Sequence, residues 1–133
     1  MWGWSFKISG VGMKTENVVR DKSYAFAVRV VKLVQYLVKE KKERVLSKQL
    51  LRSGTSVGAN VEEAIGGQSG KDFFAKLNIA YKEARESHYW LRLLHDTGYL
   101  TESQTQSLLA DTEELQKIIG SILKTLREKP SPP

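Results

Sequence analysis

The chain has 133 residues, of which 41% are hydrophobic and 27% charged, which is enough for one folded domain with a core and too few for two ordinary ones. The absence of cysteine excludes a disulfide scaffold and thiol catalysis, and it fits a reducing compartment such as the cytoplasm. The formal net charge of +6 is concentrated in residues 1–52, which favours a polyanionic partner, nucleic acid or an acidic protein, unless these cations only form a solvated surface.

The two ends of the chain are predicted to lie outside the folded domain. Residues 1–20 are interpreted as a flexible N-terminal extension, and Met13 looks like a more natural start than Met1. The first 12 residues lack the continuous apolar core of a signal peptide, because their apolar residues alternate with small or polar ones. Residues 129–133, which carry all three prolines, are predicted to be disordered.

Residues 21–128 are predicted to form an all-α domain. No proline interrupts them, and they lack the long alternation of β-branched residues that is typical of strands. Short links require neighbouring helices to pack antiparallel, so we expect an up-down-up-down four-helix bundle. The expected helices span residues 22–42, 47–65, 70–96 and 102–128. None of them is predicted to cross a membrane, because the longest apolar stretch is short and contains Arg29 and Lys32.

The first expected helix carries two adjacent apolar stripes. One consists of Phe26, Val30, Leu33 and Leu37, and the other of Ala27, Val31, Val34 and Val38. Together they form an apolar face that is wider than one neighbouring helix requires. Two interpretations stay open: the face is buried between two helices of the same bundle, or part of it is an interface between subunits.

The second expected helix contains two glycines. Gly54 lies on the apolar face of this helix, and Gly58 follows one turn later. A glycine inside a helix costs about 1 kcal/mol relative to alanine, so we interpret both as helix-packing residues that allow another backbone to approach closely. The alternative is a loop at residues 53–60 that splits the helix. The other members of this face are Leu50, Val57, Val61 and Ala64.

The third and fourth helices carry recognisable start and stop signals. Ser69 with Asp72, and Thr101 with Gln104, have the spacing of capping boxes, and Gly98 is placed to end the third helix in a left-handed conformation. The predicted core residues of the third helix are Phe73, Leu77, Ala80, Ala84, Ser87, Leu91 and Leu94. Those of the fourth are Leu108, Leu115, Ile119, Ile122 and Leu126.

The sequence contains one catalytic motif, and its context argues against it. Residues 54–58 fit G-x-S-x-G, which needs a strand that turns sharply into a helix to raise the serine, here Ser56. The preceding residues are predicted to be helical and no sheet is predicted. His88 and His95 follow arginines at the position where a di-metal bundle needs glutamate. We therefore predict no catalytic residue, no metal and no cofactor, and a protein that is not an enzyme.

Basic residues crowd the link between the first and second helices. Only Glu40 and Glu43 oppose them, so we expect one basic patch at an end of the bundle that binds the nucleic-acid backbone. The predicted nucleic-acid-binding residues are Lys39, Lys41, Lys42, Arg44, Lys48 and Arg52.

A second basic group lies on the third helix. Lys82, Arg85 and Arg92 share a face with Tyr89, and Trp90 is adjacent. Cations mixed with aromatic rings can bind phosphates and stack on bases. The preferred interpretation is that the glutamates at positions 83 and 86 neutralise these cations as ion pairs on the helix surface.

Two segments resemble a known family. The run from Leu46 to Ala64 (LSKQLLRSGTSVGANVEEA) resembles the signature of four-helix-bundle proteins encoded in 23S ribosomal RNA intervening sequences, and residues 74–94 with Gly98-Tyr99-Leu100 are similar to the same family. The resemblance covers about residues 22–126. It implies a bundle in the bacterial cytoplasm, often a homo-oligomeric ring that is a pentamer in relatives, and no known catalytic residue.

The resemblance also implies kinship with the accessory protein of diversity-generating retroelements, which binds nucleic acid and a reverse transcriptase through basic surface residues. By position, Lys48 and Arg52 would carry that role here. The leading hypothesis is a cytoplasmic homo-oligomer that binds RNA or DNA. The alternative is a scaffold that docks a partner enzyme such as a reverse transcriptase without binding nucleic acid itself.

Overall fold

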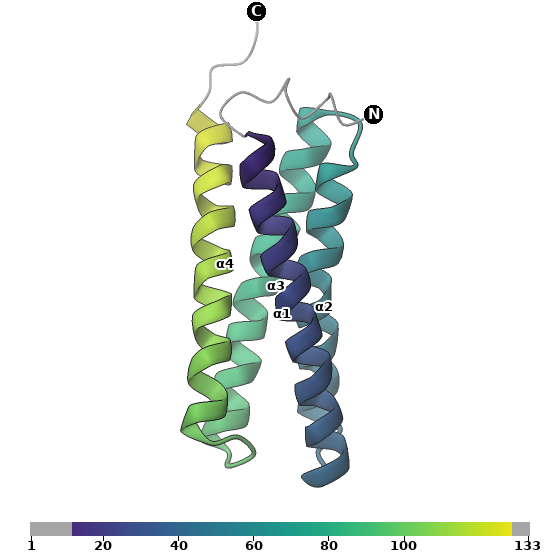
Figure 1. The fold of residues 1–133 in the computed structure, drawn as a ribbon, viewed down its shortest axis with the longest axis vertical. Helices are drawn as coiled ribbons and strands as arrows, with labels where there is room; N and C mark the ends of the chain where they lie inside the picture. The colour runs from purple at the N-terminus through teal and green to yellow at the C-terminus, as the bar shows by residue number, and fades with distance from the viewer. Residues whose placement is uncertain (1–11, 129–133) are drawn as a thin grey trace, which may run out of the picture.

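Four long helices run up and down along one axis and form an elongated bundle (Figure 1). The structure is a computed structural model that describes residues 12–128. Its helices are α1 (Met13–Glu40), α2 (Val45–Ile65), α3 (Gly70–Asp96) and α4 (Glu102–Glu128). No strand occurs within this range, and none of its helices combines the length and apolarity needed to cross a membrane. The predicted all-α four-helix bundle is confirmed.

Helix α1 begins earlier than predicted. We expected it to start near residue 22 and residues 1–20 to be flexible, but the helix starts at Met13. The reason is burial: Val19 is only 2% exposed and extends the buried face of α1 by two turns. Residues 1–11 and 129–133 lie outside the described residues. The other helices begin and end within two residues of the prediction.

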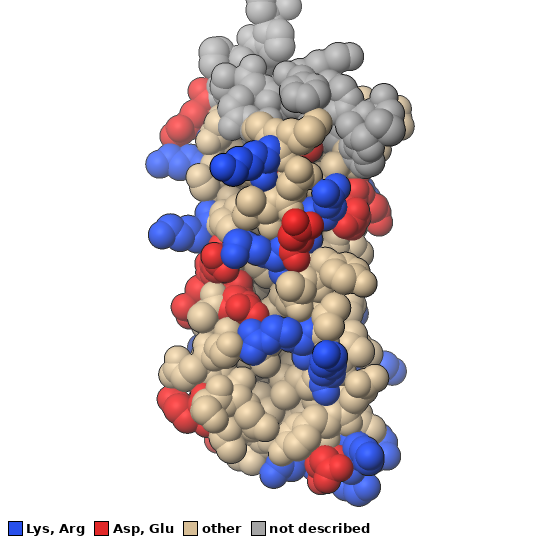
Figure 2. All heavy atoms as spheres, in the orientation of Figure 1, with Lys and Arg blue, Asp and Glu red and all other residues tan. Residues whose placement is uncertain are grey.

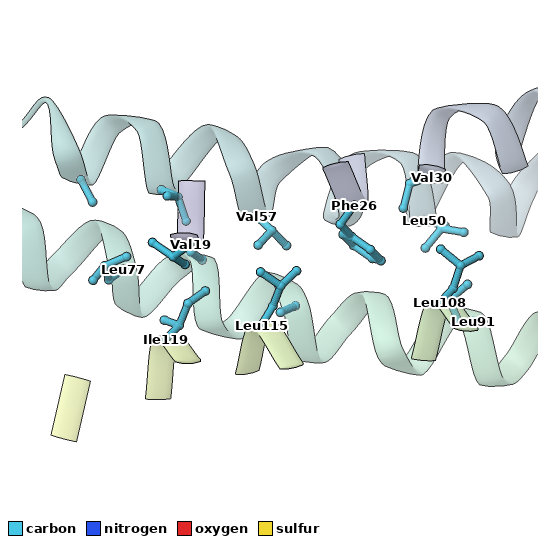
Figure 3. Packing of buried hydrophobic residues seen from close by; sticks show 14 of the residues in the cluster. Val19, Phe26, Val30, Leu50, Val57, Leu77, Leu91, Leu108, Leu115 and Ile119 are labelled. Carbon is cyan, nitrogen blue, oxygen red and sulfur yellow. The ribbon is translucent and has the colours of Figure 1, made fainter. Parts of the chain in front are cut away.

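The core runs the length of the bundle and draws side chains from all four helices (Figure 3). All seven residues predicted on α3 are buried. On α1 the prediction is partly wrong, because Val34 is buried while Leu33 is only half-buried and Val31 is exposed. On α4, Leu123 is buried, whereas Leu126, which was predicted to lie in the core, is only half-buried. The two stripes of α1 are thus divided between the core and the surface.

The predicted helix signals around α3 and α4 are present. The Ser69 hydroxyl accepts a hydrogen bond from the Asp72 backbone N–H at 3.1 Å. Thr101 and Gln104 form a reciprocal capping box, with distances of 2.8 and 3.2 Å between side-chain and backbone atoms. Gly98, which ends α3, has a φ of +89°, a left-handed conformation that suits glycine.

Helix α2 is continuous through both glycines, so the alternative loop at residues 53–60 is wrong. A Cβ atom added to Gly54 would lie 2.8 Å from both methyl groups of Val30 on α1. A Cβ added to Gly58 would lie 3.3 Å from the backbone oxygen of Ser23. The missing side chains therefore let α1 approach α2 more closely than any larger residue would allow.

The contact between α1 and α4 is more open. Arg29 pairs with Asp111 at 2.5 Å, and Lys22 pairs with Glu114 at 3.1 Å, both at partly exposed positions. Toward the α1–α2 link the two helices diverge (Figure 1). A shallow groove between them is lined by Arg29, Lys32, Leu33, Tyr36, Gln104 and Leu108.

Candidate nucleic-acid interface

A tight link brings five cations to one end of the bundle. Helix α1 ends at Glu40 and α2 begins at Val45, so the last turn of α1, the link and the first turn of α2 share this end. In the space-filling view, Lys and Arg gather there around an acidic group (Figure 2). All five are exposed, and none forms an ion pair within residues 12–128. We call this set the end patch: Lys39, Lys41, Lys42, Arg44 and Lys48.

The link itself has a sharp bend at a lysine. Lys42 has a φ of +57°, in the left-handed region that non-glycine residues adopt rarely. The Glu43 backbone N–H then donates to the Leu37 carbonyl at 3.0 Å, which closes the end of α1. This bend ends α1 two residues before the predicted boundary.

Glu43, one of the two carboxylates expected to oppose the patch, faces inward. It is 8% exposed, and its carboxylate accepts hydrogen bonds from the backbone N–H groups of Val45, Leu46 and Ser47 at 2.7–3.0 Å. Burial alone would raise the pKa of Glu43, but these donors together lower it below its ordinary value. Glu43 therefore caps α2, and Glu40 is the one exposed carboxylate between Lys39 and Lys48. Asp96 and Glu102, at the α3–α4 link of the same end, pair with His95.

Arg52 lies apart from the end patch, one turn further along α2, and its charge is compensated. It forms ion pairs with Glu83, at 3.2 Å, and with Glu86, both on α3. Glu86 also accepts a hydrogen bond from the Trp90 indole N–H at 2.9 Å. The Trp90 donor, and then Arg52, hold the pKa of Glu86 below its ordinary value against the effect of burial. Arg52 therefore connects α2 to α3.

These ion pairs also change the interpretation of α3. Glu83 and Glu86 pair with Arg52, so the preferred interpretation that they neutralise the cations of α3 itself is wrong. The cations of the outer face are exposed and form no ion pair with any described residue. Lys71, which the sequence prediction missed, shares this face because it precedes Tyr89 by 18 residues, five turns of helix. We call the set the α3 basic face: Lys71, Lys82, Arg85, Tyr89 and Arg92.

The two histidines connect α3 to α4. His88 lies 3.0 Å from Glu113 of α4. His95 lies 2.8 Å from Asp96 and 2.9 Å from Glu102, the first residue of α4. The hydrogen bond with Asp96, and the charge of Glu102, raise the pKa of His95. Both imidazoles thus lie in a polar seam between α3 and α4.

Ser56 lies in the middle of a regular helix. Its hydroxyl donates a hydrogen bond to the Arg52 carbonyl at 2.6 Å, four residues earlier in α2. The strand-to-helix bend that a nucleophile elbow requires does not occur in α2.

The outer surface of α1 is apolar in its middle. Tyr24 is 67% exposed, and Val28 and Val31 are 38% and 36% exposed. With Ala27 they line a shallow depression that Lys32 and Gln35 border. We call Tyr24, Ala27, Val28 and Val31 the α1 apolar face. Exposed apolar residues that adjoin one another are a typical feature of protein–protein interfaces.

Comparison with known proteins places the chain in a family. The family model described as "23S rRNA-intervening sequence protein" matches residues 15–121. A solved structure from Bacteroides thetaiotaomicron VPI-5482, described as a protein with unknown function from the S23 ribosomal protein family, is 55% identical with a TM-score of 0.81. That match covers 83% of this chain and 98% of the other. The chain matches none of the curated proteins. It therefore belongs to the 23S rRNA-intervening sequence protein family.

Proposed function

We propose that this protein is a non-enzymatic, homo-oligomeric accessory factor of the cytoplasm that binds RNA or DNA through the end patch. The observation that carries the proposal is five exposed cations around the α1–α2 link that form no ion pair within residues 12–128, with Glu40 as the single exposed carboxylate between Lys39 and Lys48. Such a cluster attracts the phosphate backbone without reading the base sequence. The family name refers to ribosomal RNA, which makes RNA the first ligand to test.

Assembly would proceed through the α1 apolar face. Tyr24 and Val31 lie on the outside of the bundle, where burial in their own chain offers them little. Covering them with a second copy would remove apolar surface from water, and each added subunit would contribute another end patch. Several weak patches on one particle bind a long polyanion more tightly than one patch does.

The binding test uses salt and charge reversal. We expect the Kd for a labelled RNA, measured by fluorescence anisotropy, to rise steeply between 50 and 200 mM salt. Reversal of two cations in the end patch, Lys41→Glu with Lys48→Glu, should flatten the plot of log K against log salt by about 1.4 for a single strand. The matched control is Lys117→Glu with Lys124→Glu, two exposed cations of α4 that form no ion pair within residues 12–128. Binding that is absent, or independent of salt, would contradict the proposal.

The assembly test is molar mass in solution by light scattering, with and without RNA. We expect Tyr24→Asp with Val31→Asp to reduce the oligomer to a monomer. Ile79→Asp, at an exposed apolar residue of α3, is the control and should leave the oligomer intact. A monomeric wild-type protein would contradict the assembly part of the proposal and leave the binding part standing.

The α1 apolar face also supports the alternative function, a scaffold that docks a partner enzyme such as a reverse transcriptase without direct contact with nucleic acid. In that case the purified protein would not bind RNA or DNA at any salt concentration. The purified enzyme would bind the wild-type protein and the Ile79→Asp variant, and it would not bind the Tyr24→Asp with Val31→Asp variant.

A further inference from the structure

The α3 basic face is a strip on one side of one helix. Its cations are separated by spacings of 11, 3 and 7 residues, which keep side chains on the same side of an α-helix. From Lys71 to Arg92 the strip covers 21 residues, about 32 Å of helix. It follows the outer surface of α3, whereas the end patch surrounds the α1–α2 link.

The acidic residues of α3 do not neutralise this strip. Glu83 and Glu86 bind Arg52 of α2, and Asp96 binds His95. Asp72, the remaining one, reaches back toward the link before α3, where its carboxylate would collide with any Cβ at Gly67.

The carboxylates of neighbouring helices at this border are also engaged. Glu63 of α2 pairs with Lys76 at 3.0 Å, on the side of α3 that faces α2. Glu113 of α4 lies beside His88 at 3.0 Å. Within the described residues, no ion pair reaches Lys71, Lys82, Arg85 or Arg92. The strip therefore presents uncompensated positive charge to solvent.

An aromatic ring lies within the strip. Tyr89 is 48% exposed, and the Arg92 guanidinium lies 5.9 Å from the centre of its ring. The Trp90 ring meets Tyr89 edge-on, with 4.9 Å between ring centres, and Trp90 is itself held by its hydrogen bond to Glu86. Tyr89 is thus supported on the helix surface and still exposes much of its ring. An exposed ring among cations can stack on a base whose phosphates the cations bind.

We infer that the α3 basic face is a second nucleic-acid contact, separate from the end patch, and that it binds single strands: Lys82, Arg85 and Arg92 contact the phosphates, and an unpaired base stacks on Tyr89. A duplex keeps its base faces stacked inside, so only a single strand can use the tyrosine ring. The inference rests on the proposed function in one respect: the protein must bind nucleic acid.

The experiment measures anisotropy of a labelled single-stranded RNA and of the corresponding duplex over a series of salt concentrations, with the full chain. Lys82→Glu with Arg85→Glu should weaken single-strand binding at least tenfold. It should also reduce the slope of log K against log salt by about 1.4. Lys117→Glu with Lys124→Glu, which changes the net charge equally, should weaken it by less than threefold. Circular dichroism checks that each variant stays helical.

Substitutions of Tyr89 distinguish base stacking from the attraction between charges. Tyr89→Ala should weaken single-strand binding about tenfold and leave duplex binding and both salt slopes unchanged. Tyr89→Phe keeps the ring and should bind as the wild type does. Equal losses for single strand and duplex in Tyr89→Ala would overturn the stacking role.

The outcomes distinguish the two proposals. If Lys82→Glu with Arg85→Glu binds like the α4 control while the end-patch variant loses affinity, the α3 contact is wrong and the proposed function stands. If the α3 variant alone loses affinity, the α3 contact stands and the assignment to the end patch is wrong. A wild-type protein that binds neither RNA nor DNA at low salt overturns both.

Discussion

Helix α1 packs on α2 and α4 in different ways. Against α2 the contact depends on shape: Gly54 and Gly58 leave room for Val30 and for the backbone at Ser23. Against α4 the outer contacts are ion pairs between partly exposed side chains, Arg29 with Asp111 among them, beside an open groove. Exposed ion pairs contribute about 0–1 kcal/mol, whereas a misfit in a packed contact costs about 1–3 kcal/mol. We therefore expect the α1–α2 contact to tolerate substitution far less well.

The largest effect is expected at the glycine contact. Gly54→Ala places a Cβ 2.8 Å from both Val30 methyl groups, which are stiff because valine is β-branched. We expect the free energy of unfolding to fall by about 1–2 kcal/mol, because overpacking outweighs a gain of up to about 1 kcal/mol in helix propensity. Urea denaturation followed by circular dichroism measures it.

Gly120→Ala on α4 is the matched control. Its new Cβ would lie 3.2 Å from the ring edge of Tyr81, a half-buried side chain that can move aside. We expect Gly120→Ala to be neutral or stabilising. If Gly54→Ala stabilises the protein to the same degree, the close approach of α1 and α2 is not what these glycines provide.

The second effect concerns the link between α1 and α2. Glu43→Gln removes the charge that accepts three backbone N–H groups at the start of α2, so we expect a loss of about 1 kcal/mol at pH 7. The folded pKa of Glu43 is lowered from 4.5, so its contribution is present above that value and is lost as pH falls through the lowered folded pKa.

Wild type and Glu43→Gln should therefore converge in stability at acid pH, as measured by urea denaturation between pH 3 and 7. Glu40→Gln is the control, since Glu40 is exposed and has no hydrogen bond or ion pair within residues 12–128; it should change stability by less than about 0.5 kcal/mol. A difference between wild type and Glu43→Gln that stays constant down to pH 3 would contradict the capping role.

The smallest effect is expected on the α4 side. A double-mutant cycle of Arg29→Ala and Asp111→Ala should give a coupling free energy of about 0.2–1 kcal/mol, which 1 M salt reduces. Arg29 also donates a hydrogen bond to the Ser107 hydroxyl at 2.9 Å. The loss of stability caused by Arg29→Ala alone should therefore exceed the loss caused by Asp111→Ala alone. A coupling above 2 kcal/mol would mean that α4 holds α1 as specifically as α2 does.

Much of the fold could be predicted because its signals are local. Ser69, Thr101 and Gly98 mark helix ends through contacts within one turn, and the apolar period of α3 identifies every buried residue of that helix. Gly54 and Gly58 were interpretable as packing residues because a helix interior otherwise disfavours glycine. The start of α1 was missed because Val18 and Val19 are the only apolar residues between Lys14 and Ser23, and only contacts in the bundle make Val19 a core residue.

The candidate site could be predicted only in part. The lysines of the end patch could be predicted because they flank a short link between two helices. Any tight turn in that link would bring them together. The partners of the charges could not be predicted in this way. Arg52 belongs to the basic cluster in sequence, yet across the α2–α3 contact it binds Glu83 and Glu86. Glu43 was expected to oppose the cations of the end patch, yet it is buried and caps α2.

The sequence by itself determined the helices, most of their ends and the residues that face the core, because these depend on the helical period and on contacts between near neighbours. Only the tertiary structure decided which charges remain free, because an ion pair depends on which helices lie side by side and not on distance along the chain. Arg52 is neutralised by Glu83 and Glu86 of α3 and so does not belong to the end patch. Lys82, Arg85 and Arg92 stay exposed on α3 without a counter-charge within the described residues.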